Sequence, residues 1–386
     1  MKYLRFLKNI YVVIYKICFQ VVYKCACLLR KQDSKKMVIA LYRTDQLDDN
    51  LRLVYREVLK QNPEMKIHLV HGVNKMNLKL FKEIIVLSNA RYLVLDDYYL
   101  PIYLVEPDKQ LKVVQLWHAA GAFKKFGHST VGSKFGPTTS YLKLVPIHSN
   151  YDFVYISAQK FASFYAEAFH MNLKRIFALG IPRTDLLTNA ALSHRLKTEM
   201  HKVYPFLENK NNVHILMAPT YRAKGSHHET QLDVAKAVIE LSSLLNRDKC
   251  IIFKPHPYMN SSSIEELRKC PNIIVADSRG INEWMLVADA FITDYSSSVF
   301  EFALMHKPMA HFVPDLDEYR ENRGFYTDIE SISDAAVIQE TNQLAAWINA
   351  RNKGEYFDSS RMISYNFDHV DHATARIVKH FLSTEK

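Results

Sequence analysis

The feature that most constrains the fold of this chain is an alternation, from residue 33 onward, between short β-branched runs and longer segments of helical periodicity. Strands that alternate with helices are typical of βαβ units, whose strands form a parallel sheet covered by helices. The expected strands of the first half are Met37–Leu41, Ile67–Val70, Tyr92–Leu95, Val113–Trp117, Phe153–Ile156 and Ile176–Leu179. The expected helices between them are Asp48–Leu59, Lys79–Leu87 and Ala158–Phe169.

The same alternation begins again after a helix at Asp185–His201 and a polar linker at Tyr204–Asn212. Its expected strands are His214–Ala218, Ile251–Phe253, Ile273–Val275, Ala290–Thr293 and Met309–Phe312. The expected helices are His228–Leu245, Ser263–Lys269, Gly280–Val287, Val299–His306, Gln343–Arg351 and His369–Ser383. A chain of 386 residues is long for a single core, which favours two domains.

We therefore predict two Rossmann-like α/β domains, residues 33–205 and 206–386, that face each other across a cleft. In an alternative arrangement, the last helix of the chain packs against the first domain. The sequence contains neither a GxGxxG nor a Walker motif, so dinucleotide oxidoreduction and P-loop hydrolysis have little support.

The N-terminal segment is basic and apolar at once. Residues 1–31 carry no acidic residue and supply most of the formal net charge of +10. Lysines at 8, 16 and 24 interrupt its apolar runs, which disfavours both a signal peptide and a membrane-spanning helix. The basic residues of the segment are Lys2, Arg5, Lys8, Lys16, Lys24, Arg30 and Lys31.

Winding this segment at about 100° per residue gathers its basic residues on one face of a helix. The opposite face is mainly apolar and consists mostly of Tyr3, Phe6, Leu7, Ile10, Ile14, Ile17, Val21 and Leu28. We predict that residues 1–32 form an amphipathic helix lying in the membrane interface, with residues 1–31 on an anionic lipid surface. The alternative is a helix docked on the protein's own core with solvated lysines. Nucleic acid is not an expected partner, because no basic patch interleaved with stacking aromatics follows.

Polar residues directly after the predicted strands are candidates for function, because ligands bind beyond the carboxyl ends of parallel strands. His118 follows a strand of the first half, and Gly121, Lys124 and Lys125 come shortly after it. A glycine allows close approach of a ligand to the backbone, and two lysines add positive charge. We assign these residues to the side of the site that binds an acceptor substrate, because the first half also carries the N-terminal helix that we predict to lie on the membrane.

Three further groups follow strands of the second half. Thr220 and Arg222 offer a hydroxyl and a guanidinium for phosphate binding. Lys254 and His256 alternate with two prolines, which fix the local backbone. The third group is Ser296, Ser297 and Ser298 at a helix start, where hydroxyls and N–H groups suit an anion. Arg320 and Arg323 supply further cations beyond it.

These residues indicate transfer chemistry at a diphosphate. Two histidines come from different halves, and a general base with a pKa near neutrality suits the activation of an acceptor hydroxyl. Cations and hydroxyls would neutralise the developing phosphate charge. Neither the carboxylates nor the five cysteines (Cys18, Cys25, Cys27, Cys250, Cys270) have the spacing of metal ligands. We expect no metal, and free thiols in a reducing compartment.

The chain resembles the CDP-glycerol glycerophosphotransferases of wall teichoic acid synthesis, of the primase and polymerase kind. The resemblance covers roughly residues 40–385 and rests on ordered motifs that are jointly specific: WHA-GA-KKFG, GIPRTD (Gly180–Asp185), APTYR, KPHP, TDYSSSVFEF and RGFY. It implies a GT-B fold, monotopic attachment to the cytoplasmic side of the cell membrane, and a reaction without metal or cofactor. The implied donor is CDP-glycerol or a relative, and the implied acceptor is an undecaprenyl-diphosphate-linked disaccharide or a growing polyol-phosphate chain.

The resemblance also implies roles for single residues. His118 and His256 match the two histidines on which the family's activity depends. Ser296 and Ser297 match positions that hold the donor's phosphates. Thr220, Arg222 and Arg323 match neighbouring donor-site positions. Ala119 and Tyr221 depart from the more usual glycine and tryptophan, which bears on the subfamily rather than on the chemistry.

From the length of the chain we expect a primase-like enzyme that adds the first glycerol phosphate. A glycerol- or ribitol-phosphate polymerase of the same family is one alternative. A GT-B glycosyltransferase that uses a nucleotide sugar is another, and a silent membrane scaffold that binds anionic headgroups is a third. Histidines held in fixed orientations argue against the scaffold, since the binding of anionic headgroups requires only cations.

Overall fold

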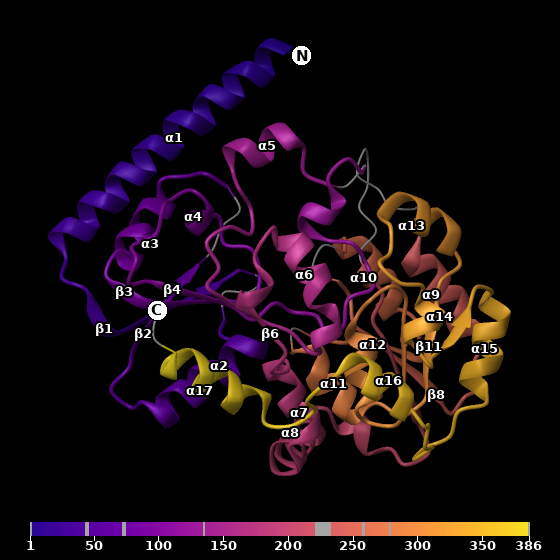
Figure 1. Ribbon diagram of the computed structural model, residues 1–386. Helices are drawn as coiled ribbons and strands as arrows, with labels where there is room; N and C mark the ends of the chain where they lie inside the picture. The colour runs from indigo at the N-terminus through magenta and orange to yellow at the C-terminus, as the bar shows by residue number, and fades with distance from the viewer. Residues whose placement is uncertain are drawn as a thin grey trace. The chain divides into compact units, whose positions relative to one another are not determined.

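The computed structural model describes residues 2–42, 46–71, 75–133, 136–220, 233–256, 259–277 and 279–384 (Figure 1). Backbone contacts divide the chain into two compact units. Unit 1 consists of Met1–His118, Phe126–Pro182 and His372–Lys386, and unit 2 of Ala119–Lys125 and Arg183–Asp371. Each unit is built around one parallel sheet, as the alternation of strands and helices predicted.

The sheet of unit 1 has six parallel strands in the order β2-β1-β3-β4-β5-β6. The direction of the strand order reverses between β1 and β3. Strand β4 is buried along its whole length, as expected of a parallel strand whose sheet is covered on both faces. The strands are β1 (Asp33–Leu41), β2 (Lys66–His71), β3 (Ala90–Leu95), β4 (Lys112–Gln115), β5 (Phe153–Tyr155) and β6 (Ile176–Phe177).

Helices α2 and α17 of unit 1 bury apolar faces against this sheet. Ile377, Val378 and Phe381 of α17 join Val54 and Val58 of α2 in one core cluster. Besides α1 (Lys2–Leu29), the α-helices are α2 (Asp49–Gln61), α3 (Lys79–Leu87), α4 (Leu100–Tyr103), α5 (Thr139–Leu144), α6 (Ala162–Phe169) and α17 (Ala373–Ser383). The 3-10 helices are η1 (Gly127–Thr130), η2 (Gln159–Phe161) and η3 (Leu173–Arg175).

Helix α1 is docked on unit 1 by one face only (Figure 1). The rings of Tyr15 and Phe19 contact Phe81 of α3, with ring centroids 5.3 and 5.1 Å apart. The hydroxyl of Tyr15 donates to the carbonyl oxygen of Asn77 at 2.8 Å. The buried residues recur at helical spacing, as a docked face requires; they are Val12, Tyr15, Phe19, Tyr23 and Ala26.

The opposite face of α1 is apolar and exposed, so the helix is docked and yet keeps the apolar face that the sequence predicted. The exposed residues include Phe6, Leu7, Ile10, Ile14, Ile17, Val21 and Leu28. By length and composition alone, Asn9–Leu29 is also long and apolar enough to cross a membrane. The lysines in this segment therefore do not exclude a spanning helix, contrary to the expectation from the sequence.

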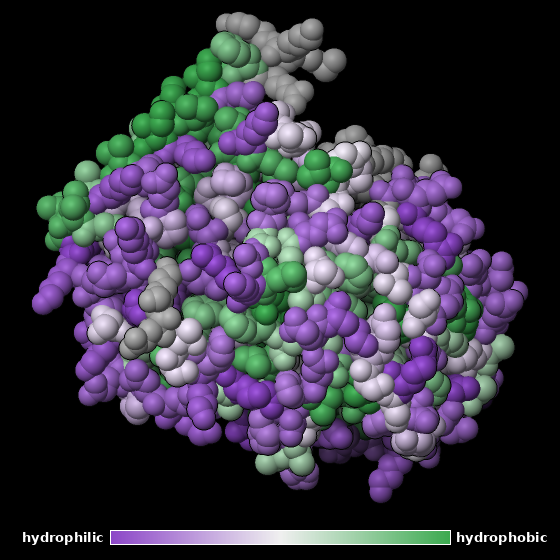
Figure 2. Space-filling model, in the orientation of Figure 1, coloured by the Kyte–Doolittle hydropathy of each residue, from purple (hydrophilic) through white to green (hydrophobic). Residues whose placement is uncertain are grey.

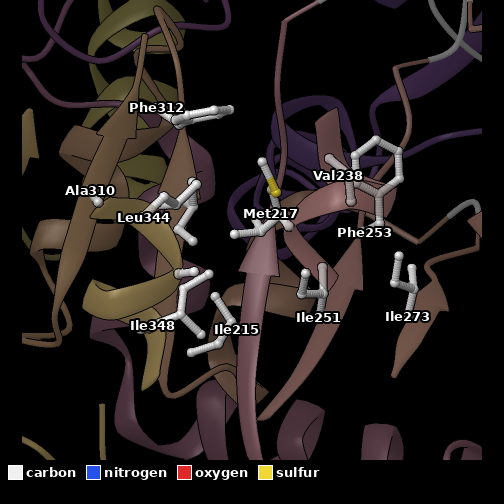
Figure 3. Close-up of a cluster of buried hydrophobic side chains, with 14 of the residues drawn as sticks. Ile215, Met217, Val238, Ile251, Phe253, Ile273, Ala310, Phe312, Leu344 and Ile348 are labelled. Atoms are coloured by element: carbon white, nitrogen blue, oxygen red, sulfur yellow. The ribbon is translucent and has the colours of Figure 1, made fainter. Parts of the chain in front are cut away.

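The sheet of unit 2 also has six parallel strands, in the order β12-β11-β10-β7-β8-β9. Its strand order reverses between β7 and β10. Figure 3 shows the core on one face of this sheet, where Ile348 of α15 lies beside Ile215 of β7. The strands are β7 (Val213–Met217), β8 (Lys249–Phe253), β9 (Ile273–Val275), β10 (Ala290–Thr293), β11 (Met309–Phe312) and β12 (Ala336–Ile338).

The helices of unit 2 begin with α7 and α8, which precede its first strand, and continue with helices that follow its strands in the same βα order. They are α7 (Asp185–Thr188), α8 (Ala190–Val203), α9 (Val234–Ser243), α10 (Ser261–Arg268), α11 (Ile281–Val287), α12 (Ser298–Ala303), α13 (Leu316–Arg323), α14 (Ile329–Ile332), α15 (Thr341–Asn349) and α16 (Ser360–Asn366). The 3-10 helix η4 (Pro182–Thr184) begins at Pro182, where the chain passes from unit 1 to unit 2. The 3-10 helix η5 (Pro205–Glu208) precedes β7.

The units differ in their bounds from the expected domains 33–205 and 206–386. Helix α8 packs against α11 of unit 2, so the chain enters unit 2 at Arg183. Arg183 is buried, and its Nε donates to Oε1 of Glu301 at 3.0 Å. Asn282 Nδ2 donates to the other carboxylate oxygen of Glu301 at 2.9 Å. A buried charge needs such partners, so this network holds the entry of the chain into unit 2.

Candidate active site

His118 lies just beyond the carboxyl end of β4, at an edge where parallel strands present ligand-binding residues. The strand ends two residues earlier than predicted, because Trp117 has a φ of +53°. This backbone conformation is unfavourable for a bulky residue. Two hydrogen bonds hold it: the N–H of Trp117 donates to Gln115 Oε1 at 2.8 Å, and Asn50 Nδ2 donates to the carbonyl of Trp117 at 2.9 Å.

The imidazole of His118 has contacts on one face of the ring and at Nδ1. Its ring stacks on the indole of Trp117, with centroids 4.2 Å apart. Its Nδ1 lies 3.0 Å from the carbonyl oxygen of Asp96 and 3.8 Å from Oδ2 of Asp97. A carbonyl oxygen only accepts, so Nδ1 carries the hydrogen, and the neutral ring keeps its lone pair on Nε2. This tautomer suits a general base.

Asp96 and Asp97 are functional candidates that the reasoning from sequence missed. Both are buried directly after β3. The sequence signal for this pair is that two carboxylates directly follow the strongly apolar run Tyr92–Leu95.

His148 lies close to this site but has a structural character. It is buried, and burial lowers its pKa to about 3, so the ring is neutral at physiological pH. Its imidazole contacts Trp117, Tyr98 and Phe169, with centroids 4.5 to 5.7 Å apart. His148 therefore supports the aromatic layer under Trp117.

The segment that follows His118 belongs to unit 2, whereas we had expected it in the first domain together with His118; its acceptor role stays a prediction. Lys124 forms an antiparallel bridge with Phe325, and the N–H of Lys125 donates to the carbonyl of Gly324 at 3.1 Å. Gly121 has a φ of +64°, and a Cβ there would lie 2.7 Å from Oδ1 of Asn366. In this structure the glycine thus allows packing within unit 2, where we had expected close approach of a ligand.

Thr220 and Asp294 meet at the carboxyl edge of unit 2, between β7 and β10, where the strand order reverses. The N–H of Thr220 donates to both carboxylate oxygens of Asp294, at 2.9 and 3.0 Å. The Thr220 hydroxyl donates to Oδ2 at 2.9 Å. Its hydrogen is thereby directed to a carboxylate, and the contact of Thr220 with a phosphate stays a prediction. Such a reversal is the usual ligand site of an open α/β sheet.

Ser296 and Ser297 lie between β10 and α12, and Ser298 is the first residue of α12. Ser296 and Ser297 are half-buried, whereas Ser298 is buried. The Oγ atoms of Ser296 and Ser298 are hydrogen-bonded at 2.8 Å. The two serines that the family resemblance assigns to phosphate are thus the two that remain partly accessible.

Helix α13 is anchored to the same loop through an aromatic stack. The rings of Tyr295 and Tyr319 are parallel within 13°, with centroids 3.7 Å apart. The hydroxyl of Tyr295 donates to Oδ1 of Asp315 at 2.7 Å. Arg323 is the last residue of this helix, and its side chain lies outside the described part of the structure. The stack therefore sets where the arginine-bearing helix lies relative to the serine loop.

Lys254 and His256 follow β8 at the same edge, and both are half-buried. The ammonium of Lys254 donates to the carbonyl of Asp277, which follows β9. The group of Thr220 and Arg222 is described only in part, because Arg222 lies outside the described residues. Buried His311 supports the edge from below: its Nδ1 lies 2.7 Å from the carbonyl oxygen of Asp294, and burial lowers its pKa.

The structure therefore groups the predicted residues by unit. His118 belongs to unit 1, whereas Gly121, Lys124, Lys125, Thr220, Lys254, His256, Ser296 and Ser297 belong to unit 2. The meeting of His118 and His256 across one cleft stays a prediction. Among the described residues, no group of three or more His, Cys, Asp or Glu side chains is arranged to hold a metal ion.

Two doubly wound parallel units with polar residues at their carboxyl edges define an α/β protein with a GT-B-like fold. The sequence model of the family described as CDP-Glycerol:Poly(glycerophosphate) glycerophosphotransferase matches residues 22–380. The chain belongs to this family.

Several relatives are named as teichoic acid primases or polymerases. The teichoic acid ribitol-phosphate primase of Bacillus spizizenii is 38% identical over 93% of this chain and 92% of its own length. The ribitol-phosphate polymerase TarL of Staphylococcus aureus is 31% identical over 89% of this chain and 61% of its own length. The glycerol-phosphate primase of Bacillus subtilis is 23% identical over 83% of this chain and 82% of its own length.

Solved structures show the same fold. A variant of the wall teichoic acid polymerase TagF matches with a TM-score of 0.74 and 20% identity, over 99% of this chain and 97% of that chain. A UDP-GlcNAc 2-epimerase of Methanocaldococcus jannaschii matches with a TM-score of 0.56 and 13% identity, over 90% of this chain and 100% of that chain. Because an epimerase shares it, the fold alone does not assign the reaction.

Proposed function

We propose that this protein transfers a polyol phosphate from a CDP-polyol to a lipid-linked acceptor at the cytoplasmic face of the membrane and releases CMP. The observation that carries the proposal is the 38% identity with a ribitol-phosphate primase over 93% of this chain and 92% of that protein. The proposed reaction is a priming step, in which a first polyol phosphate is added.

Ribitol phosphate is the group that the relatives favour. Identity is 38% with the ribitol-phosphate primase but 23% with the glycerol-phosphate primase of Bacillus subtilis. CDP-glycerol, which the motifs suggested, is therefore the competing donor. Repeated addition, as the name of the 31% identical TarL describes, is the competing reaction.

In the proposed mechanism His118 is the general base toward the acceptor hydroxyl. The bond from Nδ1 to the carbonyl of Asp96 keeps the lone pair of the neutral ring on Nε2. As Nε2 takes the proton, the acceptor oxygen attacks the phosphorus that bears the polyol. The bond from that phosphorus to the bridging oxygen breaks, and CMP leaves as a phosphate anion that needs little protonation.

The donor's diphosphate is assigned to the edge of unit 2. Ser296, Ser297, Lys254, His256, Arg222 and Arg323 would neutralise its charge through hydrogen bonds and cations. Because the segment 119–125 is bonded to Gly324 and Phe325, we assign Lys124 and Lys125 to the donor as well. That assignment replaces the acceptor role expected from sequence.

Membrane attachment is proposed to use the exposed apolar face of α1. Figure 2 shows a band of hydrophobic residues along this helix, while most of the rest of that view is hydrophilic. Several basic side chains of the segment contact the protein instead: Lys16 Nζ donates to the carbonyl of Leu144 at 3.1 Å, Lys24 pairs with Glu106 at 3.3 Å, and Arg30 Nη1 donates to the carbonyl of Ile85 at 2.6 Å. Insertion of apolar side chains therefore has more support than binding of anionic headgroups.

The proposal is tested by mass spectrometry of products made from the purified protein. CDP-ribitol and CDP-glycerol are supplied separately, each with an undecaprenyl-diphosphate-linked disaccharide and with the same lipid already bearing one polyol phosphate. We expect one ribitol phosphate on one of these acceptors, together with release of CMP that requires the acceptor.

Other products would identify the alternatives. A glycerol phosphate product would assign the donor to CDP-glycerol, and a ladder of additions would identify a polymerase. Transfer from a nucleotide sugar alone, or the absence of CMP release with every acceptor, would overturn the proposed function.

A further inference from the structure

We propose that Asp97 is a positioning residue that raises the basicity of His118 and stabilises its imidazolium form during transfer. This inference rests on the proposed function, because it assigns Asp97 a part in the activation of the acceptor hydroxyl. It concerns a carboxylate that lies outside every motif of the family resemblance.

Two neighbouring residues, Asp96 and Asp97, lie near Nδ1 of His118 and have different effects on the ring. The carbonyl of Asp96, at 3.0 Å, accepts the hydrogen and fixes the tautomer. The carboxylate of Asp97, with Oδ2 at 3.8 Å, supplies a negative charge to the same side of the ring. Once Nε2 has taken a proton, the ring is cationic, and an opposite charge within about 4–6 Å favours that form.

The position of Asp97 relative to His118 is set by one buried side chain. Gln115, which has no exposed surface, donates from Nε2 to the carbonyl of Asp97 at 3.0 Å. Its Oε1 accepts from the N–H of Trp117 at 2.8 Å. Gln115 thus connects Asp97, in the loop after β3, to the residue before His118. Asp97 is itself oriented, since its Oδ1 accepts from the N–H of Tyr98 at 2.8 Å.

The carboxylate is buried next to a half-buried imidazole, which increases its effect. Asp97 is 7% exposed, and the side chain of His118 is 28% exposed. Charges that are shielded from solvent interact more strongly than surface pairs. Other titratable groups described near this pair include the buried side chain of Asp96, Tyr98 next to Asp97, Tyr151, which interacts with Asp97, and His148, which is neutral.

The test compares the full-length protein with Asp97→Asn and with Asp152→Asn as a matched control. Asn keeps the size of the side chain and removes its charge, and the carbonyl of Asp96 still fixes the tautomer. Asp152 is a carboxylate of the same sheet, but its Oδ2 accepts from the N–H of Val113 at the amino end of β4. It can therefore affect folding without facing His118.

Two readouts are used. The pKa of His118 is measured by NMR titration of labelled histidine, with the signal assigned through His118→Gln. We expect Asp97→Asn to lower that pKa by about one unit and Asp152→Asn to leave it unchanged. In the transfer assay, kcat of Asp97→Asn should fall about 10- to 100-fold, the acid limb of the pH profile should move to lower pH, and the donor KM should stay the same.

The outcomes separate this inference from the proposed function. An unchanged His118 pKa in Asp97→Asn would overturn the inference whether or not the protein transfers a polyol phosphate. Equal changes in kcat for Asp97→Asn and Asp152→Asn, without a shift of the acid limb, would also overturn it. A wild-type protein that transfers no polyol phosphate would overturn the proposed function, while the NMR titration would still decide the pairing.

Discussion

Thr220 donates both its backbone N–H and its hydroxyl to the carboxylate of Asp294, which ties the end of β7 to the end of β10 where the strand order of unit 2 reverses. The two residues come from two separate motifs, APTYR and TDYSSSVFEF. These hydrogen bonds hold together two loops at the edge of unit 2 where we propose that phosphate binds. One loop precedes Arg222, and the other carries the serines.

This relationship predicts that Thr220→Val weakens donor binding without removing the base. Valine keeps the shape and the N–H bond but loses the hydroxyl bond to a charged acceptor, which is worth about 1.5–3 kcal/mol. We expect the KM for the donor to rise about tenfold or more and the free energy of unfolding to fall by about 1.5–3 kcal/mol. Thr198→Val, which removes a hydroxyl bond on exposed α8, is the control, and equal KM values for the two variants would contradict the prediction.

The buried pair of Arg183 and Glu301 should be essential for the stability of unit 2. Arg183→Met leaves a buried carboxylate without its cation, which costs about 3–5 kcal/mol. The double variant Arg183→Met, Glu301→Met should recover much of that loss, since no charge then stays buried. Urea unfolding measures both. A double variant as unstable as the single one would show that the charge is not the cause.

Gly121 should tolerate no side chain. In Gly121→Ala the positive φ and the contact with Asn366 Oδ1 at 2.7 Å act together, so we expect a loss of about 2–5 kcal/mol. Gly354 has a φ of +71° with nothing within 4 Å of an added Cβ. Gly354→Ala should therefore cost only about 1–2 kcal/mol. Thermal unfolding of both separates backbone strain from the steric clash.

Membrane binding through α1 should depend on its apolar face and little on lipid charge. We expect Ile14→Glu with Ile17→Glu to reduce sedimentation with vesicles at least tenfold, because both side chains are exposed on that face. Leu173→Glu, at an exposed position of η3, is the control. Binding that vanishes when anionic lipid is left out, or at high salt, would instead support the headgroup contact expected from sequence.

Glu83 should make stability depend on pH. Burial raises its pKa to about 7, and the Tyr99 hydroxyl donates to its Oε2 at 3.1 Å. The folded state therefore binds the proton more tightly than the unfolded state, whose pKa is near the ordinary 4.5. The stabilising contribution is present below about pH 4.5 and is lost as the pH rises through 7.

Glu83→Gln removes this dependence, since the amide stays neutral and still accepts from Tyr99. We measure the free energy of unfolding in urea for the variant and for wild type. The difference, variant minus wild type, should be more positive at pH 8 than at pH 5. Glu199→Gln, at an exposed position of α8, should show no such gain. The same difference between variant and wild type at both pH values would contradict the prediction.

Local sequence was enough to find most of the fold. β9, β10, β11 and α3 have the predicted bounds, because a buried parallel strand must be a short continuous apolar run. The missed elements β12, α4, α5, α13, α14 and α16 are short or lack a strong apolar period. Their backbone is set by contacts such as the stack of Tyr319 on Tyr295, which no local pattern encodes.

The sequence by itself determined two parallel α/β units, the strand ends that carry His118, Thr220, His256 and Ser296, and an N-terminal helix with an apolar face. It did so because periodicity and loop position are local properties of the chain. Only the tertiary structure decided that Asp97 lies beside His118, that Thr220 bonds to Asp294, and that Lys124 lies with unit 2. These pairings join residues distant in sequence, and their geometry arises when separate strand ends are brought to one edge of a sheet.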